Sequence, residues 1–307
     1  MNFFVNVITR VQRDFFRWRY LESARGILNT APLKPGALPF VVLSMVQKRD
    51  VVSYLVALKS FCLHANPERV VIICDPSIDA NDRATFLHHV PHVQLLEAEA
   101  CADPRVPRGG TWERLLAISA MAVENYVVQL DADTVTIGPI PEVLAAISDR
   151  RGFVIGERAS QQLKSLAETS GHVRDNFPTN THIQSISELN MDQLDRPSST
   201  RYVRGCSGFT GFPPSSGMGT SLIEFSSDMQ NLIGERWTNW GTEQVTSNYL
   251  VANSDNAQVL PYPKYTTPNA MDCGTTFLHF IGYTRFVNSK YEKKSRDIIN
   301  RLKSAAV

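Results

Sequence analysis

Apolar runs of strand length alternate, along the first half of the chain, with segments whose apolar residues recur at helical spacing. The apolar runs are Phe40–Val46, Val70–Cys74, His92–Leu96 and Val127–Leu130, and the helical segments cover roughly 50–64, 79–89 and 111–125. Unbroken apolar runs are typical of parallel strands that are buried on both faces. Strands that alternate with helices predict an α/β fold in which a mostly parallel, doubly wound sheet has helices on its faces.

The two ends of the chain are predicted to be helices outside this core. Residues 3–28 place a set of apolar side chains at helical spacing, namely Phe4, Val7, Val11, Phe15 and Trp18. A proline-rich linker follows. We therefore divide the chain into an amphipathic helix and linker (1–38), one large α/β domain (39–288) and a basic C-terminal helix (289–307). Residues 157–204 are polar and poorly patterned, which is typical of a lid or a substrate-selecting loop, and we assign this insert to the acceptor side of the site.

The charge and composition indicate which kinds of partner and which cell compartment to expect. The net charge of +1 gives no overall attraction to nucleic acid. The 5 cysteines are widely spaced and form no CxxC pair, which indicates a reduced, cytoplasmic protein. No apolar stretch reaches the roughly 18 residues needed to span a membrane, and the N-terminus does not resemble a signal peptide.

Basic residues concentrate in residues 1–30 and 285–307, and the middle of the chain is acidic. Basic ends can hold a protein at the inner face of an anionic membrane. Two solvated terminal helices explain the same pattern, and the sequence leaves both interpretations open.

The strongest chemical signal is the pair of carboxylates that ends the fourth strand, Asp131 and Asp133. Ligands of open α/β sheets bind at the carboxyl ends of the strands. Two hard oxygen donors at such an edge suit Mn²⁺ or Mg²⁺, which keeps open positions for a phosphate ligand. We expect Asp133 in an exposed turn. An Asp-rich turn without an ion is the alternative.

Other segments of the chain carry residues that suit the same edge. His279 is a candidate third metal ligand, Gly282 permits close backbone approach, and Arg285 is suited to phosphate oxygens. Arg114 opens the helix before the aspartate strand. Each also has a plain structural explanation, as a core histidine, a turn or a structural arginine.

Two further segments are candidates for the sugar pocket. Asn239–Gln244 offers polar side chains for hydroxyl groups, or a helix N-terminus capped by Thr242. Gly205–Phe209 is a small-residue turn that suits the floor of such a pocket, or is simply a tight turn.

Taken together, these segments resemble the GT-A glycosyltransferases, most closely the retaining family that includes glycogenin and the bacterial lipopolysaccharide galactosyl- and glucosyltransferases. The resemblance runs from about Phe40 to Phe286. It implies that Asp131, Asp133 and His279 hold Mn²⁺ on the diphosphate of a UDP-sugar. It also implies nucleotide contacts, and the residues predicted to make them are Ser44, Met45, Val46, Asp75, Arg114, Ala132, Gly282 and Arg285. The predicted catalytic residues are Gln244, which lies beneath the sugar in relatives, together with Glu243 and Arg285. The implied acceptor is a glycan, a glycolipid or another hydroxyl compound.

The chain departs from this family at three places. Arg285-Phe286 replaces Lys-Pro, Cys206 replaces an asparagine, and Glu243-Gln244-Val245 replaces Asp-Gln-Asp. A haloacid dehalogenase-type phosphohydrolase also has an apolar strand followed by Asp-x-Asp, with Asp131 as its nucleophile. That motif normally opens the core, whereas three strand–helix units precede it here. A non-catalytic nucleotide-binding protein of the same fold is the second alternative.

Overall fold

The computed structural model describes residues 2–304, and the side chains of residues 2–8 and of Tyr283 are outside the description. The predicted apolar positions Phe4 and Val7 therefore lie outside the described residues. In the described chain the central sheet has seven strands in the order β10-β6-β9-β4-β1-β2-β3. These strands are β1 (Leu38–Val46), β2 (Pro67–Cys74), β3 (Val93–Glu97), β4 (Tyr126–Leu130), β6 (Phe153–Gly156), β9 (Gly205–Phe212) and β10 (Gln258–Val259).

The sheet is mostly parallel, as the apolar runs predict. β3, β2, β1 and β4 pair in parallel, and β9 is antiparallel to both of its neighbours, β4 and β6. Alternate residues of β1 enter two separate cores, because side chains of a strand point to opposite faces. Phe40 and Val42 pack in one core, and Val41 and Leu43 pack in the other. The predicted α/β fold with a mostly parallel sheet is thus confirmed.

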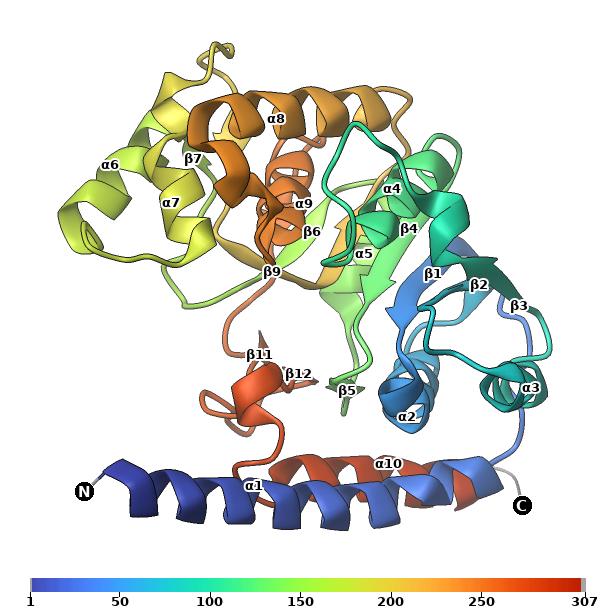
Figure 1. Cartoon of the computed structure of the whole chain (residues 1–307). Coiled ribbons are helices and arrows are strands. Elements are labelled where there is room, and N and C mark those ends of the chain that lie inside the picture. Colours follow the sequence, from blue (N-terminus) through green and yellow to red (C-terminus); the bar gives the residue numbers. More distant parts are fainter. Residues whose placement is uncertain (1, 305–307) are drawn as a thin grey trace.

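Helices cover both faces of the sheet (Figure 1). One core takes its helical residues mainly from α1 (Asn2–Ala24), α2 (Val51–Cys62), α3 (Ala80–His89), α5 (Pro141–Ser148) and α10 (Lys290–Ser304). The other core is built with α4 (Trp112–Met121), α8 (Met218–Ile233) and α9 (Thr242–Ala252). A small sheet, β11-β12-β5, comprises β5 (Thr134–Thr136), β11 (Tyr265–Thr266) and β12 (Phe277–His279), and lies below the main sheet in Figure 1.

The two terminal helices lie side by side and run in the same direction (Figure 1). At one end Gln12 Nε2 donates to the carbonyl of Val287, and at the other end Gly26 lies against Ile299. Between them the ring of Tyr20 stacks on Tyr291 with centroids 4.0 Å apart. The apolar side chains of α1 are divided: Tyr20 and Ala24 are buried, whereas Val11, Phe15 and Trp18 stay 50–63% exposed.

Residues 157–204 are more regular than their polar composition indicates. They contain α6 (Leu166–Asn176), α7 (Ile183–Leu189) and the short strands β7 (Lys164–Ser165) and β8 (Arg201–Tyr202). α6 begins with a capping box in which Ser165 and Glu168 satisfy each other's backbone N–H groups. α7 contacts α9, so the insert adjoins the main domain at that helix.

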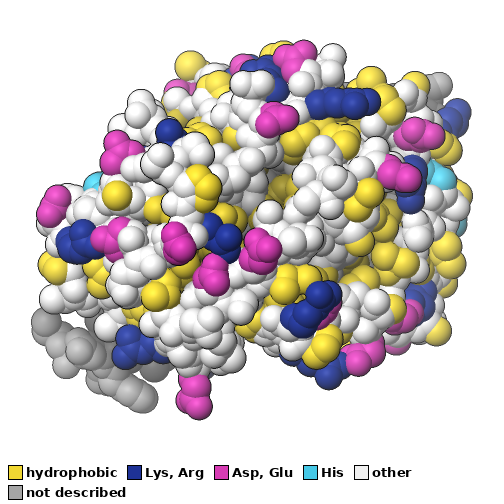
Figure 2. Space-filling model, turned by 90° about the horizontal axis from the view of Figure 1, so that it is seen from above, with side chains coloured by type: hydrophobic (Ala, Val, Ile, Leu, Met, Phe, Trp, Pro, Cys, Tyr) yellow, Lys and Arg dark blue, Asp and Glu magenta, His cyan; other side chains and the backbone are white. Residues whose placement is uncertain are grey.

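On the face away from α1, Lys and Arg side chains are interspersed with Asp and Glu (Figure 2). In the described part of the chain, no helix has the length and apolarity that crossing a membrane requires. The proposed domain boundaries at 38 and 288 remain predictions.

Candidate active site

The aspartate pair lies where β4 ends and the chain turns into β5. The backbone N–H of Asp131 donates to the carbonyl of Gly208 on the neighbouring β9, 2.8 Å away. Thr134 closes the turn, because its hydroxyl donates to the carbonyl of Asp131 at 2.9 Å. The turn therefore holds both carboxylates at a fixed separation at the carboxyl edge of the parallel strands.

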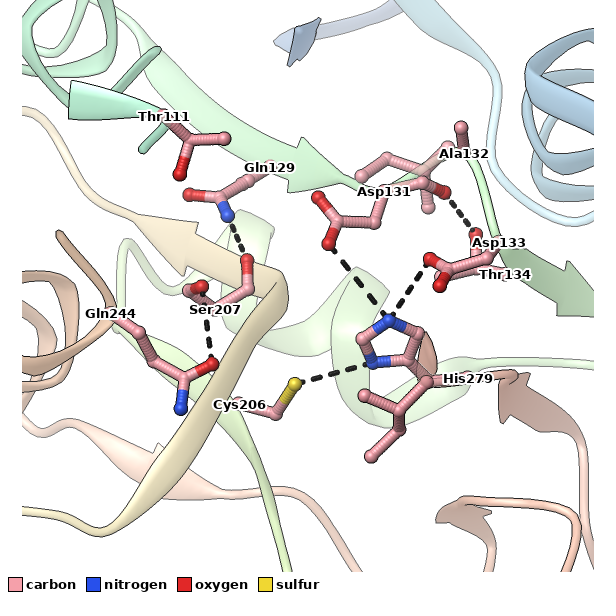
Figure 3. A network of polar contacts seen from close by, with 12 residues as sticks. Thr111, Gln129, Asp131, Ala132, Asp133, Thr134, Cys206, Ser207, Gln244 and His279 are labelled. Atoms are coloured by element: carbon pink, nitrogen blue, oxygen red, sulfur yellow. Dashed lines mark hydrogen bonds and ion pairs between the residues drawn. The ribbon is translucent and has the colours of Figure 1, made fainter. Parts of the chain in front are cut away.

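His279 reaches this turn from β12. The small sheet makes this possible, because β12 pairs antiparallel with β5 and brings His279 opposite Thr134. Its Nε2 is 3.1 Å from Asp133 Oδ1 and 3.9 Å from Asp131 Oδ2 (Figure 3). One ligand atom from each of the three residues lies within 4.8 Å of the others. The structure thus brings the three predicted metal ligands together.

The chemistry of these donors fits a divalent cation. Two carboxylates and one imidazole form an oxygen-rich set, which suits Mn²⁺ better than a soft ion. Three protein ligands leave coordination positions for a phosphate.

Asp133 is not the exposed turn residue that the sequence analysis predicts. It is 4% exposed, because β12 and the segment after it cover the turn. Burial alone would raise the pKa of its carboxyl group, but His279 and Arg285 outweigh burial and hold that pKa below its ordinary value. Burial likewise opposes charge on His279, yet Cys206 and Asp133 raise the pKa of the imidazole well above its ordinary value. Asp133 is therefore ionised and partnered by cations.

Two residues of β9 position the imidazole. Cys206 Sγ is 3.2 Å from His279 Nδ1, on the side of the ring away from the aspartates (Figure 3). Gly208 lies against the ring, and a Cβ on it would come within 2.1 Å of His279 Cε1. The departure from the family's asparagine at Cys206 thus falls directly behind the metal triad, where outer contacts fix a ligand's orientation.

Arg285 joins the triad to the N-terminus of α2. Its Nε donates to Asp133 Oδ2 at 2.8 Å, and its Nη1 donates to Asp50 Oδ1 at 3.1 Å. Gly282, three residues earlier, is exposed, and a Cβ there would meet nothing within 4 Å. Arg285 therefore lies beside the three candidate metal ligands, and its guanidinium is paired with the carboxylates of Asp133 and Asp50.

Arg114, Glu243 and Gln244 form the opposite wall of the site. The buried guanidinium of Arg114 bridges Asp131 and Glu243, with Nη2 3.2 Å from both Glu243 oxygens. Gln244 Nε2 donates to Gln184 Oε1 of α7 at 3.3 Å, so the predicted sugar-side residue touches the insert. Burial raises the pKa of Glu243, which Arg114 partly offsets.

The remaining predicted nucleotide contacts lie on the strand ends. The Ser44 hydroxyl donates to the carbonyl of Leu130 at 2.6 Å, and Asp75 Oδ1 accepts from the backbone of Ser77. Met45 is half-buried, and Val46 is buried. The Ala132 carbonyl accepts a hydrogen bond from the Tyr291 hydroxyl at 3.3 Å. Contacts from these residues to a nucleotide stay predictions.

Several residues at the site carry no signal in the sequence. Asp50 lies just before α2 and Gln184 lies in α7, and neither belongs to a segment with a recognisable motif. Thr111 takes a left-handed backbone conformation, with φ at 74°, and its hydroxyl donates to Glu243 at 3.1 Å. A φ of this sign is uncommon outside glycine, and no residue pattern reveals it at Thr111. Only the spatial arrangement could have found them.

The described chain combines a mostly parallel sheet with an Asp-x-Asp turn at the carboxyl edge of its strands, and its structural matches are to GT-A glycosyltransferases. No protein-family profile matches the chain, and no curated protein matches it. Among solved structures, the bifunctional glycosyltransferase WbbM aligns with 87% of this chain at 13% identity and a TM-score of 0.53. The glycosyltransferase GlyE of Streptococcus pneumoniae TIGR4 aligns with 88% of this chain at 12% identity and a TM-score of 0.51. The alignments span 51% of WbbM and 64% of GlyE, so this chain matches about half of one and less than two thirds of the other. The GT-A fold that the motifs predict is confirmed.

Proposed function

We propose that this protein is a metal-dependent glycosyltransferase that moves a sugar from a nucleotide-sugar, preferentially a UDP-sugar, to a hydroxyl acceptor. The observation that carries the proposal is the convergence of Asp131, Asp133 and His279 at the carboxyl edge of a GT-A sheet. Mn²⁺ is the preferred ion and Mg²⁺ the substitute, because the donor set includes one nitrogen.

Each part of the site has a place in the transfer reaction. A divalent ion held by Asp131, Asp133 and His279 would supply positive charge to the departing diphosphate. Arg285 lies against Asp133 and adds a second positive charge on the same side, where negative charge builds as the anomeric C–O bond breaks. Arg114 holds Asp131 in one orientation from the other side. In this arrangement the protein's main contribution is fixed charge at the leaving group.

Gln244 is our candidate for the residue beneath the sugar in a retaining transfer. Its Oε1 lies 3.5 Å from the Ser207 hydroxyl, and its Nε2 bonds Gln184. The neighbouring carboxylate, Glu243, is engaged by Arg114 and therefore suits a positioning role better than a nucleophilic one. Since Gln184 belongs to the insert, we assign the acceptor to the side of the site where residues 157–204 contact α9.

The phosphohydrolase alternative is not favoured. Its mechanism uses Asp131 as a free nucleophile, whereas here Asp131 is paired with a buried arginine and lies 3.9 Å from His279. The structural matches are to glycosyltransferases. A non-catalytic nucleotide-binding protein is distinguished from an enzyme only by turnover.

The deciding experiment is calorimetry with UDP, GDP, CDP and dTDP in Mn²⁺, followed by slow hydrolysis of the matching nucleotide-sugars without acceptor. We expect UDP to bind most tightly and its sugars to be hydrolysed. A tenfold preference for another base, about 1.4 kcal/mol, would contradict the donor assignment. Binding without any hydrolysis would favour the non-catalytic alternative.

We further propose peripheral contact with an anionic membrane, on the cytoplasmic side, through the two terminal helices. The exposed stripe of Val11, Phe15 and Trp18 follows one face of α1. Exposed basic side chains also lie on both helices, namely Arg10, Lys293, Arg296, Arg301 and Lys303. Aromatic side chains on one face with basic neighbours are typical of helices that lie in a membrane interface. A lipid-linked acceptor fits this location.

A further inference from the structure

A pocket of about 240 Å³ lies between α1, the N-terminus of α2 and the turn after β12. We call it the arginine pocket, because four of its lining residues are arginines: Arg13, Arg17, Arg49 and Arg285. Asp50 is the single carboxylate in the lining. Two of the four arginines therefore come from α1, a helix that lies outside every motif used to assign the site.

The positive charge of the arginine pocket exceeds its internal compensation. Asp50 is shared, since its oxygens lie 3.5 Å from Arg49 Nε and 3.1 Å from Arg285 Nη1. Arg13 faces Asp14 at 3.5 Å, but both side chains are more than half exposed, so this pair contributes little. Among the described side chains, those of residues 9–304 other than Tyr283, none forms an ion pair with Arg17. Such a concentration of guanidinium groups suits a phosphate ligand, which they bind through forked hydrogen bonds.

The arginine pocket adjoins the candidate metal triad through one side chain. The guanidinium of Arg285 is the link, because it bonds Asp133 with Nε and Asp50 with Nη1. Gly282 also lines the pocket, and its lack of a side chain leaves open space there. An anion bound in this pocket would therefore contact the guanidinium of Arg285, which also bonds Asp133, one of the proposed metal ligands.

We propose that the arginine pocket binds a phosphate group of the donor diphosphate, and that Arg13 and Arg17 of α1 are donor-binding residues. The proposal rests on the proposed function and adds to it a binding contribution from the N-terminal helix. It gives the two arginines a ligand at the sugar-transfer site, separate from the membrane contact proposed for the opposite face of α1. Because the contact is to phosphate, it is independent of the base.

The test measures binding of UDP and of uridine by the full chain in Mn²⁺, with Arg17→Gln and the double variant Arg13→Gln/Arg17→Gln. We expect UDP affinity to fall about tenfold in the single variant and further in the double variant, with uridine binding unchanged. Arg17→Lys should recover part of the loss, because it keeps the charge. Arg105→Gln is the control, since Arg105 is an exposed arginine that lines neither the pocket nor the proposed membrane surface. Thermal unfolding of each variant checks that the fold is retained.

The outcomes separate this proposal from the proposed function. Unchanged UDP affinity in the double variant would overturn the inference while leaving the glycosyltransferase assignment standing. A loss of binding to anionic vesicles, without a loss of UDP affinity, would also overturn it and assign the arginines to the membrane. If the unaltered chain binds no nucleoside diphosphate, the proposed function fails. In that case, suppose that the unaltered chain binds inorganic pyrophosphate and the double variant does not. The pocket would then be a phosphate site, and its assignment to the donor would be overturned.

Discussion

At the scale of single residues, the two aspartates of the metal turn differ in how the fold supports them. The side chain of Asp131 is 28% exposed, and its partner Arg114 also pairs with a second carboxylate, that of Glu243. Asp133 is 6% exposed at its side chain and balances both His279 and Arg285. Removal of the two charges therefore has different consequences for stability.

Asp131→Asn should abolish Mn²⁺-dependent turnover and change stability by less than about 1 kcal/mol. Asp133→Asn should also abolish turnover, but at a cost of about 3–5 kcal/mol, because it leaves buried cations without their counter-charge. Metal binding by calorimetry and chemical unfolding of both variants measure the two effects. Asp255→Asn, which changes an exposed carboxylate away from the site, is the control. Full activity of either site variant in chelator-sensitive assays would contradict the ligand assignment.

Cys206 is predicted to act as a positioning residue through His279. Cys206→Ala removes the contact to Nδ1 and should weaken Mn²⁺ binding by about tenfold or more. Cys206→Ser keeps a polar partner at a similar place and should recover most of the affinity. The measurement is the Kd of Mn²⁺ for each variant, with unfolding curves to exclude a general loss of structure. Equal affinities in all three proteins would show that the thiol is only a packing group.

At the scale of elements, the N-terminal helix supports the metal turn through a chain of contacts. Tyr20 of α1 stacks on Tyr291 of α10, and the Tyr291 hydroxyl donates to the carbonyl of Ala132, between the two aspartates. Removal of residues 1–38 would therefore uncover Tyr291 and disturb the site itself. An N-terminal truncation cannot separate membrane binding from catalysis.

Tyr20→Ala should lower stability by about 3–5 kcal/mol, as expected for removal of a buried aromatic ring, and should weaken Mn²⁺ binding as well. Phe15→Ala, on the exposed side of the same helix, is the control and should change neither. Urea unfolding and metal titration measure both effects. If Tyr20→Ala binds Mn²⁺ as tightly as the unaltered chain, the contact chain has no influence on the site.

A second link between elements is sensitive to pH. Lys59 of α2 donates to Thr30, to the Ala31 carbonyl and, within 3.1 Å, to Nδ1 of His89 at the end of α3. Burial, with the nearby charge of Lys59, lowers the pKa of His89 to about 4. The unfolded chain therefore binds a proton near pH 6.5 that the folded chain does not accept until lower pH. The stabilisation is complete above pH 6.5 and is lost as the pH falls toward 4.

Between pH 7 and pH 5 this link should contribute a loss of about 2 kcal/mol in the free energy of unfolding. His89→Gln keeps an acceptor for Lys59 without a titrating group, so its loss over the same interval should be smaller by that amount. His88→Gln, on the exposed side of the helix, should behave like the unaltered chain. Identical losses in all three proteins would remove His89 as the cause.

At the scale of the whole molecule, the surface of the paired terminal helices distinguishes membrane contact from simple packing. Co-sedimentation of the full chain with anionic vesicles at low salt should be reduced severalfold in Phe15→Ser/Trp18→Ser. The matched control is Leu87→Ser/Val123→Ser, which removes two side chains of similar exposure elsewhere, 49% and 50%. Binding should also weaken as salt rises, because the basic residues contribute through screened charge. Equal sedimentation of the two double variants would leave α1 as a structural helix.

The sequence predicts the sheet well and the site less completely, for physical reasons. Because buried parallel strands are continuous apolar runs, β1 to β4 and the helices between them can be predicted from the sequence. The motifs also single out Asp131, Asp133 and His279, which the structure brings together. The helices of the insert cannot be predicted in this way, because α6 and α7 bury only short apolar stripes within a polar composition. The burial of Asp133 and the arginine pocket escape prediction, since both depend on how distant segments meet across β5, β12 and α1.

Gly208 lies so close to the ring of His279 that no side chain fits at this position. Any Cβ there would lie 2.1 Å from one atom of the His279 ring and 2.7 Å from both ring nitrogens, and Cys206 and Asp133 contact the ring from two sides. A protein of this fold that keeps Asp131, Asp133 and His279 but replaces this glycine should therefore lack the imidazole position that the proposed ion requires. A comparison of such proteins that considers only the three candidate ligands would miss this difference, which position 208 records.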